Sequence, residues 1–260
     1  MERKQRFPLR QAASRIGGAL QRVIARGVEL LAGRPASCTM GVPLNLPKDA
    51  SILDVGCGDG WFLLALRSQA HANLWGLDVS DHARDRLVRA GVRMHVGDLF
   101  AAPLPERHFD LIRMEHVLEH LPKPFESLQV LHSLLKPGGF LVLNLPNIDS
   151  LSFRLLGPNF ASLDLPRHFY HYTPTSLYRL AERSGFRVQE LRTAGIWQVF
   201  ALSASSHFKL QGRRFAAKLL RHPVMKIFSP LYGALVTWLG KGDSLSAVLV
   251  VDQPVNLVED

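Results

Sequence analysis

Three glycines and two acids fall within seven residues, in the run Asp54-Val55-Gly56-Cys57-Gly58-Asp59-Gly60. Glycine lets a backbone turn tightly and lets a ligand approach where a Cβ would be in the way. The G-x-G-x-G spacing differs from the G-x-G-x-x-G of dinucleotide sites. Acids in this loop would repel a pyrophosphate. The run therefore predicts a nucleotide-type pocket for a ligand that carries a cationic amino group.

A further acid, Asp78, ends the next apolar run, about 20 residues beyond the glycines. A carboxylate at the tip of a second strand can accept both hydroxyl groups of a ribose. This feature is typical of several ribose-containing cofactors and does not by itself choose among them.

A second pattern, His116-x-x-Glu119-His120, also occurs in a group of zinc peptidases, where it must lie on a long helix. Here Pro122 and Pro124 end any helix within about a turn of His120. The apolar run before it, Phe109 to Met114, is typical of a strand in a nucleotide-binding fold. We therefore expect no metal at these residues.

These residues must be positioned by alternating strands and helices. The apolar runs at 51–55, 73–78, 92–96, 109–114 and 140–145 predict strands, separated by helices at 61–67, 81–90 and 125–135. Such spacing gives right-handed crossovers and a parallel sheet that binds ligands at the carboxyl ends of its strands. A helix over 174–184 capped by Thr173, then strands at 186–191 and 245–251, complete an α/β fold.

The glycine run closely resembles motif I of class I S-adenosylmethionine-dependent methyltransferases. Three further segments resemble the ubiquinone/menaquinone-type small-molecule O-methyltransferases: Phe109-Asp110 with 115–121 (Glu-His-Val-Leu-Glu-His-Leu), 135–141 (Leu-Lys-Pro-Gly-Gly-Phe-Leu), and Pro146-Asn147 with 167–177. The resemblance covers roughly 50–190 and the last strand. It implies a Rossmann-like, seven-stranded, mostly parallel sheet with an antiparallel end hairpin, helices on both faces and an extra helical insertion.

The resemblance also implies the cofactor and the residues that hold it. The cofactor is S-adenosyl-L-methionine, with Asp98 at the adenine amino group, Leu99 against the ring, and the end of the fourth strand lining the pocket. The expected cofactor-binding residues are Asp54, Gly56, Cys57, Gly58, Gly60, Asp78, Val79, Asp98, Leu99, Met114 and Glu115. The fourth strand lacks the (Asp/Asn)-Pro-Pro-aromatic motif of amino-methyltransferases that act on DNA bases or glutamine.

A dense polar and aromatic run, 163–177, follows the fifth strand, where a substrate would face the methyl group. An oxygen or nitrogen acceptor must lose a proton, and a histidine is the natural base near neutral pH. His168 is the first candidate, His171 the second and His120 the third. The alternative is that these histidines only hold the loop through hydrogen bonds.

The net charge of +9 is unevenly distributed. Residues 1–34 carry eight Arg and Lys against two acids, and 191–242 carry eight against none, whereas 35–190 is nearly neutral. Two cysteines form no disulfide framework, and we see no secretory signal, so the cytoplasm is the expected compartment. We expect a basic amphipathic arm at 1–34, a linker at 35–49 and a methyltransferase domain at 50–260 with an insertion at about 199–240.

The basic segments also contain apolar residues, and the insertion includes Phe228, Tyr232 and Trp238. Basic residues beside aromatic and apolar ones favour peripheral binding to anionic lipid. The resulting hypothesis is a small or lipid-linked acceptor, methylated at oxygen at the inner face of the membrane. A helical lid over a soluble acceptor is the alternative for the insertion.

Other functions are disfavoured but remain open. An RNA methyltransferase could use basic flanks to bind phosphates, yet no RNA-binding module is recognisable, so nucleic acid is not the expected partner. A non-catalytic assembly protein with this fold fits poorly with an intact glycine loop and its acids. The glycine spacing argues against an NAD-dependent dehydrogenase. The sequence does not indicate the oligomeric state.

Overall fold

The computed structural model describes residues 38–39, 42–43 and 46–252. The expected arm at 1–34 lies outside these residues, and the expected linker at 35–49 is described only in part. Within that linker, β1 (Cys38–Thr39) and β2 (Val42–Pro43) form a short antiparallel pair. The chain divides into two compact units, which we call the sheet unit (38–149, 162–193 and 244–252) and the helical unit (150–161 and 194–243).

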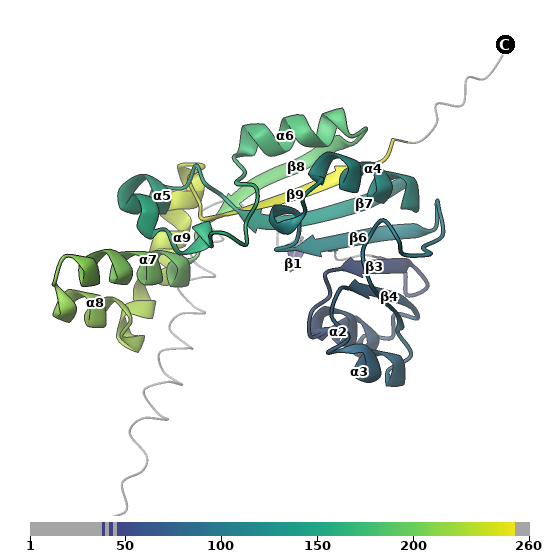
Figure 1. Ribbon diagram of the computed structural model, residues 1–260, viewed down its shortest axis with the longest axis horizontal. Coiled ribbons are helices and arrows are strands. Elements are labelled where there is room, and N and C mark those ends of the chain that lie inside the picture. The colour runs from purple at the N-terminus through teal and green to yellow at the C-terminus, as the bar shows by residue number, and fades with distance from the viewer. Residues whose placement is uncertain (1–37, 40–41, 44–45, 253–260) are drawn as a thin grey trace, which may run out of the picture. The chain divides into compact units, whose positions relative to one another are not determined.

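The sheet unit contains seven strands in the order β5-β4-β3-β6-β7-β9-β8 (Figure 1). The pairs β3·β4, β3·β6, β4·β5 and β6·β7 are parallel, and β7·β9 is antiparallel, which confirms the expected mixed sheet. The strands are β3 (Ser51–Val55), β4 (Asn73–Asp78), β5 (Arg93–Val96), β6 (Phe109–Glu115), β7 (Leu135–Pro146), β8 (Arg187–Ala194) and β9 (Ser244–Val250).

Both faces of the sheet are covered because the strand side chains alternate between two cores. Leu53 and Val55 pack in one core, which also holds residues of α4 and α6, whereas Ile52 packs in the other with residues of α2 and α3. Figure 1 shows α4 and α6 apart from α2 and α3. The helices are α2 (Trp61–Ser68), α3 (Arg84–Arg89), η1 (Leu118–His120), α4 (Pro124–Leu134), η3 (Ala161–Leu163) and α6 (Pro174–Arg183).

Three local details bear on the sequence predictions. Helix α3 begins at Arg84, three residues later than expected, and the Ser80 hydroxyl accepts the His82 N–H in the segment before it. Strand β7 begins at Leu135, so the expected turn at 136–139 lies inside it as an irregularity in its pairing with β6. Thr173 caps α6 as predicted, in a reciprocal capping box with Ser176 and with Pro174 at the first helical position.

The helical unit contains α5 (Leu151–Leu156), η2 (Gly157–Asn159), α7 (Trp197–Leu210), α8 (Arg214–Leu220), η4 (Pro223–Phe228) and α9 (Ser229–Trp238). Its interior holds a buried polar centre: the Tyr232 hydroxyl lies 2.8 Å from Asp243 Oδ2 and 2.7 Å from Ser152 Oγ. Burial raises the pKa of both Tyr232 and Asp243. In the part of the chain that the structure describes, no helix is both long and apolar enough to cross a bilayer.

A buried ion pair joins two central strands of the sheet. Arg113 Nη1 on β6 donates to Asp54 Oδ1 on β3 at 2.9 Å, and the two side chains are 3% and 1% exposed. The Arg113 guanidinium also lies over the Phe62 ring, 4.3 Å from its centroid, and it contacts Glu115. Burial raises the pKa of Asp54 to about 6, and the charge of Arg113 opposes that rise. Arg113 is therefore what makes an ionised Asp54 tolerable inside the sheet.

We predict that Arg113→Met lowers the free energy of unfolding by about 3–5 kcal/mol, the usual cost of leaving one member of a buried pair alone. Without Arg113 the pKa of Asp54 rises further. A carboxyl group with a raised folded-state pKa contributes stability at low pH that is lost as pH rises through that pKa. The loss caused by the substitution should therefore be larger at pH 8 than at pH 5.

Urea unfolding followed by tryptophan fluorescence measures both effects. Arg86→Met on the exposed surface of α3 is the matched control and should change stability by no more than about 0.5 kcal/mol. If Arg113→Met lowers the free energy of unfolding as little as the control does, the Arg113–Asp54 pair does not contribute the predicted stability.

Candidate active site

The glycine loop connects β3 to α2, and each of its glycines has a positive φ, from +53° to +74°. A Cβ at Gly56 would lie 2.3 Å from Val117 Cγ2, and one at Gly60 would lie 2.6 Å from Leu87 Cδ2. A Cβ at Gly58 would meet nothing within 4 Å. Gly56 and Gly60 are therefore required for packing, and Gly58 is the glycine that faces open space.

Asp78, at the carboxyl end of β4, is bound to this loop. Its Oδ2 accepts the Gly58 N–H at 2.8 Å, and its Oδ1 accepts the Ser80 N–H at 2.9 Å. A carboxylate has about four acceptor positions, so Asp78 keeps capacity for the hydroxyl groups of a ribose. The structure thus brings Asp78 and Gly58 together, as the sequence predicts.

The expected cofactor-binding residues divide into two groups by exposure. The side chains of Asp54, Cys57, Leu99 and Met114 are buried in the sheet unit, so in this conformation they are not exposed to a ligand. Burial also raises the pKa of the Cys57 thiol to about 12, and its Sγ lies 3.7 Å from Met94 Sδ. Gly60 is buried as well, and the exposed or half-buried members are Gly56, Gly58, Asp78, Val79, Asp98 and Glu115.

Asp98 has a structural role as well. Its Oδ1 accepts the Phe100 N–H at 2.8 Å, which is the backbone-capping role of a loop-end aspartate. The side chain is exposed, so a second oxygen remains for a ligand. Its expected contact with the adenine amino group stays a prediction.

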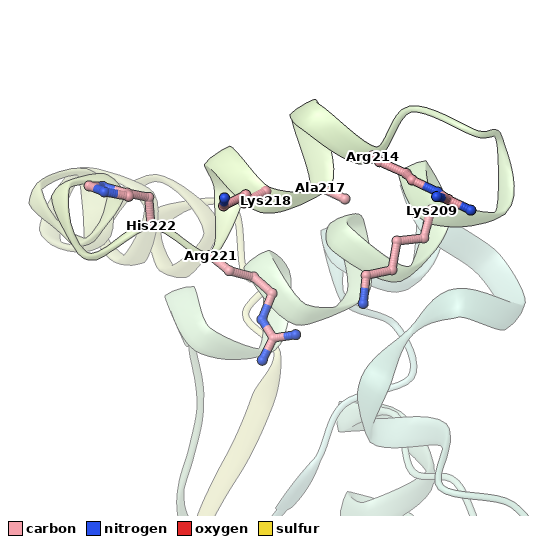
Figure 2. Close-up of a pocket in the computed structure, with 6 residues that line it drawn as sticks. All are labelled: Lys209, Arg214, Ala217, Lys218, Arg221 and His222. Atoms are coloured by element: carbon pink, nitrogen blue, oxygen red, sulfur yellow. The ribbon is translucent and has the colours of Figure 1, made fainter.

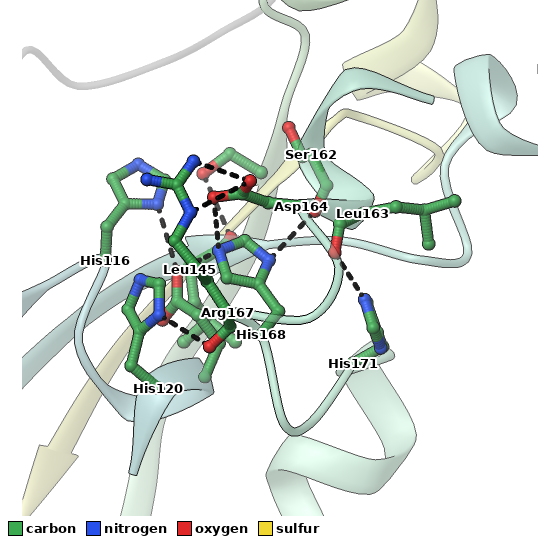
Figure 3. A network of polar contacts seen from close by, with 11 residues as sticks. His116, His120, Leu145, Ser162, Leu163, Asp164, Arg167, His168 and His171 are labelled. Atoms are coloured by element: carbon green, nitrogen blue, oxygen red, sulfur yellow. Dashed lines mark hydrogen bonds and ion pairs between the residues drawn. The ribbon is translucent and has the colours of Figure 1, made fainter. Parts of the chain in front are cut away.

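A second cluster lies in the sheet unit beyond the end of β6 (Figure 3). His120 Nδ1 lies 2.9 Å from the Arg167 carbonyl oxygen, and His168 Nδ1 lies 3.0 Å from that of Ser162. A carbonyl oxygen only accepts, so each Nδ1 carries a proton, and each ring keeps a lone pair on Nε2 when it is neutral. The ring centroids of His120 and His168 are 4.6 Å apart.

His168 is the better placed of the candidate bases. It is 8% exposed, and burial lowers its pKa, helped by the nearby His120 and opposed by Glu119. The neutral, proton-accepting form therefore prevails near pH 7. By contrast, His171 Nε2 donates to the Leu163 carbonyl at 2.9 Å, so that nitrogen is used in holding the loop.

The loop that carries these histidines is bound to the segment after β6 by its backbone. The N–H groups of Phe169 and Tyr170 both donate to the Glu119 carbonyl, at 2.8 and 3.3 Å. The Tyr170 hydroxyl donates to the Pro122 carbonyl at 3.2 Å. Residues about 50 positions apart in the sequence are thereby held beside one another.

The peptidase-like pattern does not form a helical metal site. Only the short η1 is present, and His116, with φ of +54°, precedes it. The His116 side chain is half exposed and its Nδ1 lies 3.2 Å from Glu119 Oε1. The structure instead places the Glu119 carboxylate beside His120 and His168, with one ligand atom from each within 4.8 Å of the others.

Two buried charges were missed as functional candidates. Arg113 appears in the sequence only as an unusual residue inside an apolar strand, and Glu119 only as part of the H-x-x-E-H pattern. A charged residue in a buried strand is itself a signal, because it needs a partner elsewhere in the fold. The identity of that partner requires the tertiary structure.

Comparison with known proteins agrees with this architecture. A family described as a methyltransferase domain matches residues 18–191. Two relatives, both ubiquinone biosynthesis O-methyltransferases, are 30% identical: that of Nitrosospira multiformis over 154 residues (54% of this chain, 64% of the relative) and that of Paraburkholderia xenovorans over 171 residues (62% and 72%). The chain thus spans less than two thirds of the first of these proteins.

Solved structures show the same fold at low identity. Phosphoethanolamine N-methyltransferase 2 of Haemonchus contortus, solved with S-adenosyl-L-methionine, is 17% identical, with a TM-score of 0.56 over 81% of this chain and 50% of that one. A possible histamine N-methyltransferase of Thermotoga maritima is 15% identical, with a TM-score of 0.52 over 93% and 95%. The expected fold and the expected cofactor are confirmed, and the chain belongs to the methyltransferase domain family as an S-adenosylmethionine-dependent enzyme.

Proposed function

We propose that this enzyme transfers the methyl group of S-adenosylmethionine to an oxygen atom of a small or lipid-like acceptor at the surface of an anionic membrane. The observation that supports an acceptor that must lose a proton, as a hydroxyl group must, is the buried imidazole of His168, whose lowered pKa leaves the Nε2 lone pair free near pH 7. The names of the relatives from Nitrosospira and Paraburkholderia, both O-methyltransferases in ubiquinone biosynthesis, support the same choice of atom.

The chemistry is an in-line displacement that depends on positioning. An oxygen lone pair of the acceptor forms a bond to the methyl carbon while the bond from that carbon to sulfur breaks, which releases S-adenosylhomocysteine. The hydroxyl proton must leave, and a neutral imidazole nitrogen accepts it near pH 7.

We predict that labelled methyl groups from S-adenosylmethionine enter the lipid extract of bacterial membranes and not the water-soluble extract. The product should resist alkaline hydrolysis, because an ether methyl survives conditions that remove a methyl ester. His168→Ala should lower the rate by about 10²–10⁴-fold, the usual contribution of acid–base groups, without weakening S-adenosylhomocysteine binding.

The control for that experiment is His132→Ala on α4, whose ring contacts that of Phe186 edge to face, 5.1 Å between centroids. It should keep the wild-type rate. Label that enters only water-soluble compounds would contradict the lipid-like acceptor, and an alkali-labile product would contradict transfer to a hydroxyl group.

The support for a membrane surface comes from the helical unit. From 194 to 242 the chain has no acid, and its cations alternate with exposed apolar side chains. Phe215 and Trp238 are each 81% exposed and Leu210 is 80% exposed. The other large apolar side chains that are exposed here are Leu202, Leu219, Val224, Ile227, Phe228, Leu231, Leu235 and Leu239.

Four basic residues of this unit lie around a cavity of about 690 Å³ between α7 and α8 (Figure 2). Lys209, Arg214, Lys218, Arg221 and His222 line it together with Ala217. Such a set of like charges requires counter-anions, and the phosphate groups of lipids supply them. Exposed aromatic and leucine side chains beside basic ones favour insertion into the interfacial region of a bilayer over binding to RNA.

We predict that the protein sediments with vesicles that contain about 30% anionic phospholipid at low salt, and much less with neutral vesicles. Each basic residue near such a surface contributes about 1 kcal/mol. The double charge reversal Lys218→Glu with Arg221→Glu should therefore weaken binding at least tenfold. Reversing Arg84 and Arg86 on α3, a matched pair in the sheet unit, should have little effect.

The absence of sedimentation at low salt would contradict membrane association and leave the insertion as a lid over a soluble acceptor. If both double variants lost vesicle binding equally, the net charge of the protein, and not the surface formed by the helical unit, would explain the binding. Salt-sensitive binding to RNA without binding to vesicles would favour the alternative function, an RNA methyltransferase.

A further inference from the structure

We propose that the cavity between α7 and α8 in the helical unit is a discrete binding site for one diphosphate group, carried by a lipid or by a soluble compound. A diffuse basic surface would attract many anions at once, whereas this site takes one ligand per chain through particular side chains. The site deepens the proposed membrane surface, and it rests on the proposed function only where the diphosphate belongs to a lipid.

The turn between the two helices brings their cations together. Helix α7 ends in a Schellman motif, in which the Arg213 N–H donates to the Phe208 carbonyl at 2.9 Å. The Gly212 N–H donates to the Lys209 carbonyl at 3.0 Å, and Gly212 has a φ of +75°, which favours glycine. Helix α8 then begins at Arg214. Lys209, in the last turn of α7, and Arg214 therefore lie on the two sides of one fixed turn.

The cations that follow along α8 share one face of the helix. Arg214, Lys218 and Arg221 are spaced by four and three residues, which places them above one another. Ala217 lies on the same face, where its methyl group lines the cavity and occupies little of it (Figure 2). The cavity of about 690 Å³ falls within the range of about 300–1,000 Å³ that is usual for small-molecule sites.

The helical unit has no free acid with which to neutralise these cations. Its one acid, Asp243, is 1% exposed and accepts hydrogen bonds from the Tyr232 hydroxyl and the Ile196 N–H, both at 2.8 Å. Among the described residues, no ion pair includes any of the four permanent cations that line the cavity: Lys209, Arg214, Lys218 and Arg221. Like charges around one space repel each other, and a bound anion would replace that repulsion by attraction.

The number and kind of these cations indicate a diphosphate. The phosphodiester of an ordinary membrane lipid carries a single negative charge, which would leave most of the cations unpaired. A terminal phosphate carries about −1.5 to −2 at pH 7, and the second phosphate of a diphosphate adds further charge. The guanidinium groups of Arg214 and Arg221 can each bind two phosphate oxygens at once, whereas a lysine acts as a point charge.

His222 adds a donor that does not depend on pH. Its Nδ1 accepts the Val224 N–H at 3.4 Å, so the neutral ring carries its proton on Nε2. That nitrogen can donate to a phosphate oxygen whether the ring is neutral or charged. The site therefore needs no protonated histidine to hold its ligand.

The neighbouring stripe of α8 is apolar and exposed. Phe215 and Leu219 each follow a cavity residue by one position, about 100° further around the helix. Their exposed fractions are 81% and 48%. A ligand whose diphosphate enters the cavity would lay an apolar chain along these side chains. A prenyl-type diphosphate thus matches both stripes, whereas a free diphosphate matches only the cationic one.

The test titrates the full chain by calorimetry at low salt, with S-adenosylhomocysteine present so that the cofactor pocket is filled. The ligands are inorganic pyrophosphate and, below its micellar concentration, farnesyl diphosphate. We expect one site per chain for each ligand, competition between the two, and tighter binding of farnesyl diphosphate. Arg214→Gln and Lys218→Gln should each weaken pyrophosphate binding about tenfold or more, because each removes a charge-assisted hydrogen bond.

The matched control is Arg213→Gln. It removes the same charge from the adjacent exposed residue, which does not line the cavity, and should bind pyrophosphate like the wild type. The three substituted side chains are all exposed, so the variants should fold, and S-adenosylhomocysteine binding verifies this.

The proposal is overturned if neither diphosphate shows saturable binding, or if the control variant loses as much affinity as the two cavity variants. Equal affinity for the two diphosphates would support the site and assign it to a soluble compound. Vesicle sedimentation without diphosphate binding would refute this site and leave the proposed membrane surface standing. Diphosphate binding without sedimentation would refute the membrane surface and leave the site standing.

Discussion

The site depends on the in-register parallel pairing of β3 with both of its neighbours. Val55, the last residue of β3, lies opposite Leu77 on β4 and Met114 on β6. The residues that follow these three positions therefore emerge at one edge of the sheet: the glycine loop, Asp78 and Glu115. A shift of one residue in either pairing would turn every buried side chain of that strand to the opposite face, so two cores enforce the register. The geometry of the pocket is thus a consequence of how the sheet packs.

The histidine cluster lies at the same edge of the sheet, but its residues are positioned by hydrogen bonds of the backbone. Here the Glu119 carbonyl accepts hydrogen bonds from two backbone N–H groups of the loop at 162–172. The Arg167 carbonyl of the same loop accepts a hydrogen bond from His120 Nδ1. Backbone groups do most of the positioning, which leaves the Glu119 carboxylate and two Nε2 atoms without structural duties. Side chains that are held firmly yet keep free lone pairs are suited to binding or to proton transfer.

Local features of the chain were predictable where the interacting residues lie close together in the sequence. The strand at 51–55, the glycine loop and the Thr173 cap each follow from residues within a few positions of one another. Asp54 is a counter-example: it directly precedes the glycine loop in sequence, yet it is buried in β3 and paired with Arg113, 59 positions away. The same limit applies to His120 and His168. The H-x-x-E-H pattern relates His120 only to its sequence neighbours, whereas the structure brings His168 beside it from a distant loop.

We expect the residues around Gly58 and Asp78 to hold the methyl donor. Calorimetric titration with S-adenosylhomocysteine, beside NADH, tests this expectation on the wild type, Asp78→Ala and the exposed neighbour variant Asp81→Ala. Only S-adenosylhomocysteine should show saturable binding. Its binding should be at least tenfold weaker in Asp78→Ala, since a hydrogen bond to a charged group contributes about 1.5–3 kcal/mol, and little changed in Asp81→Ala. Equal affinity in all three proteins, or preference for NADH, would contradict it.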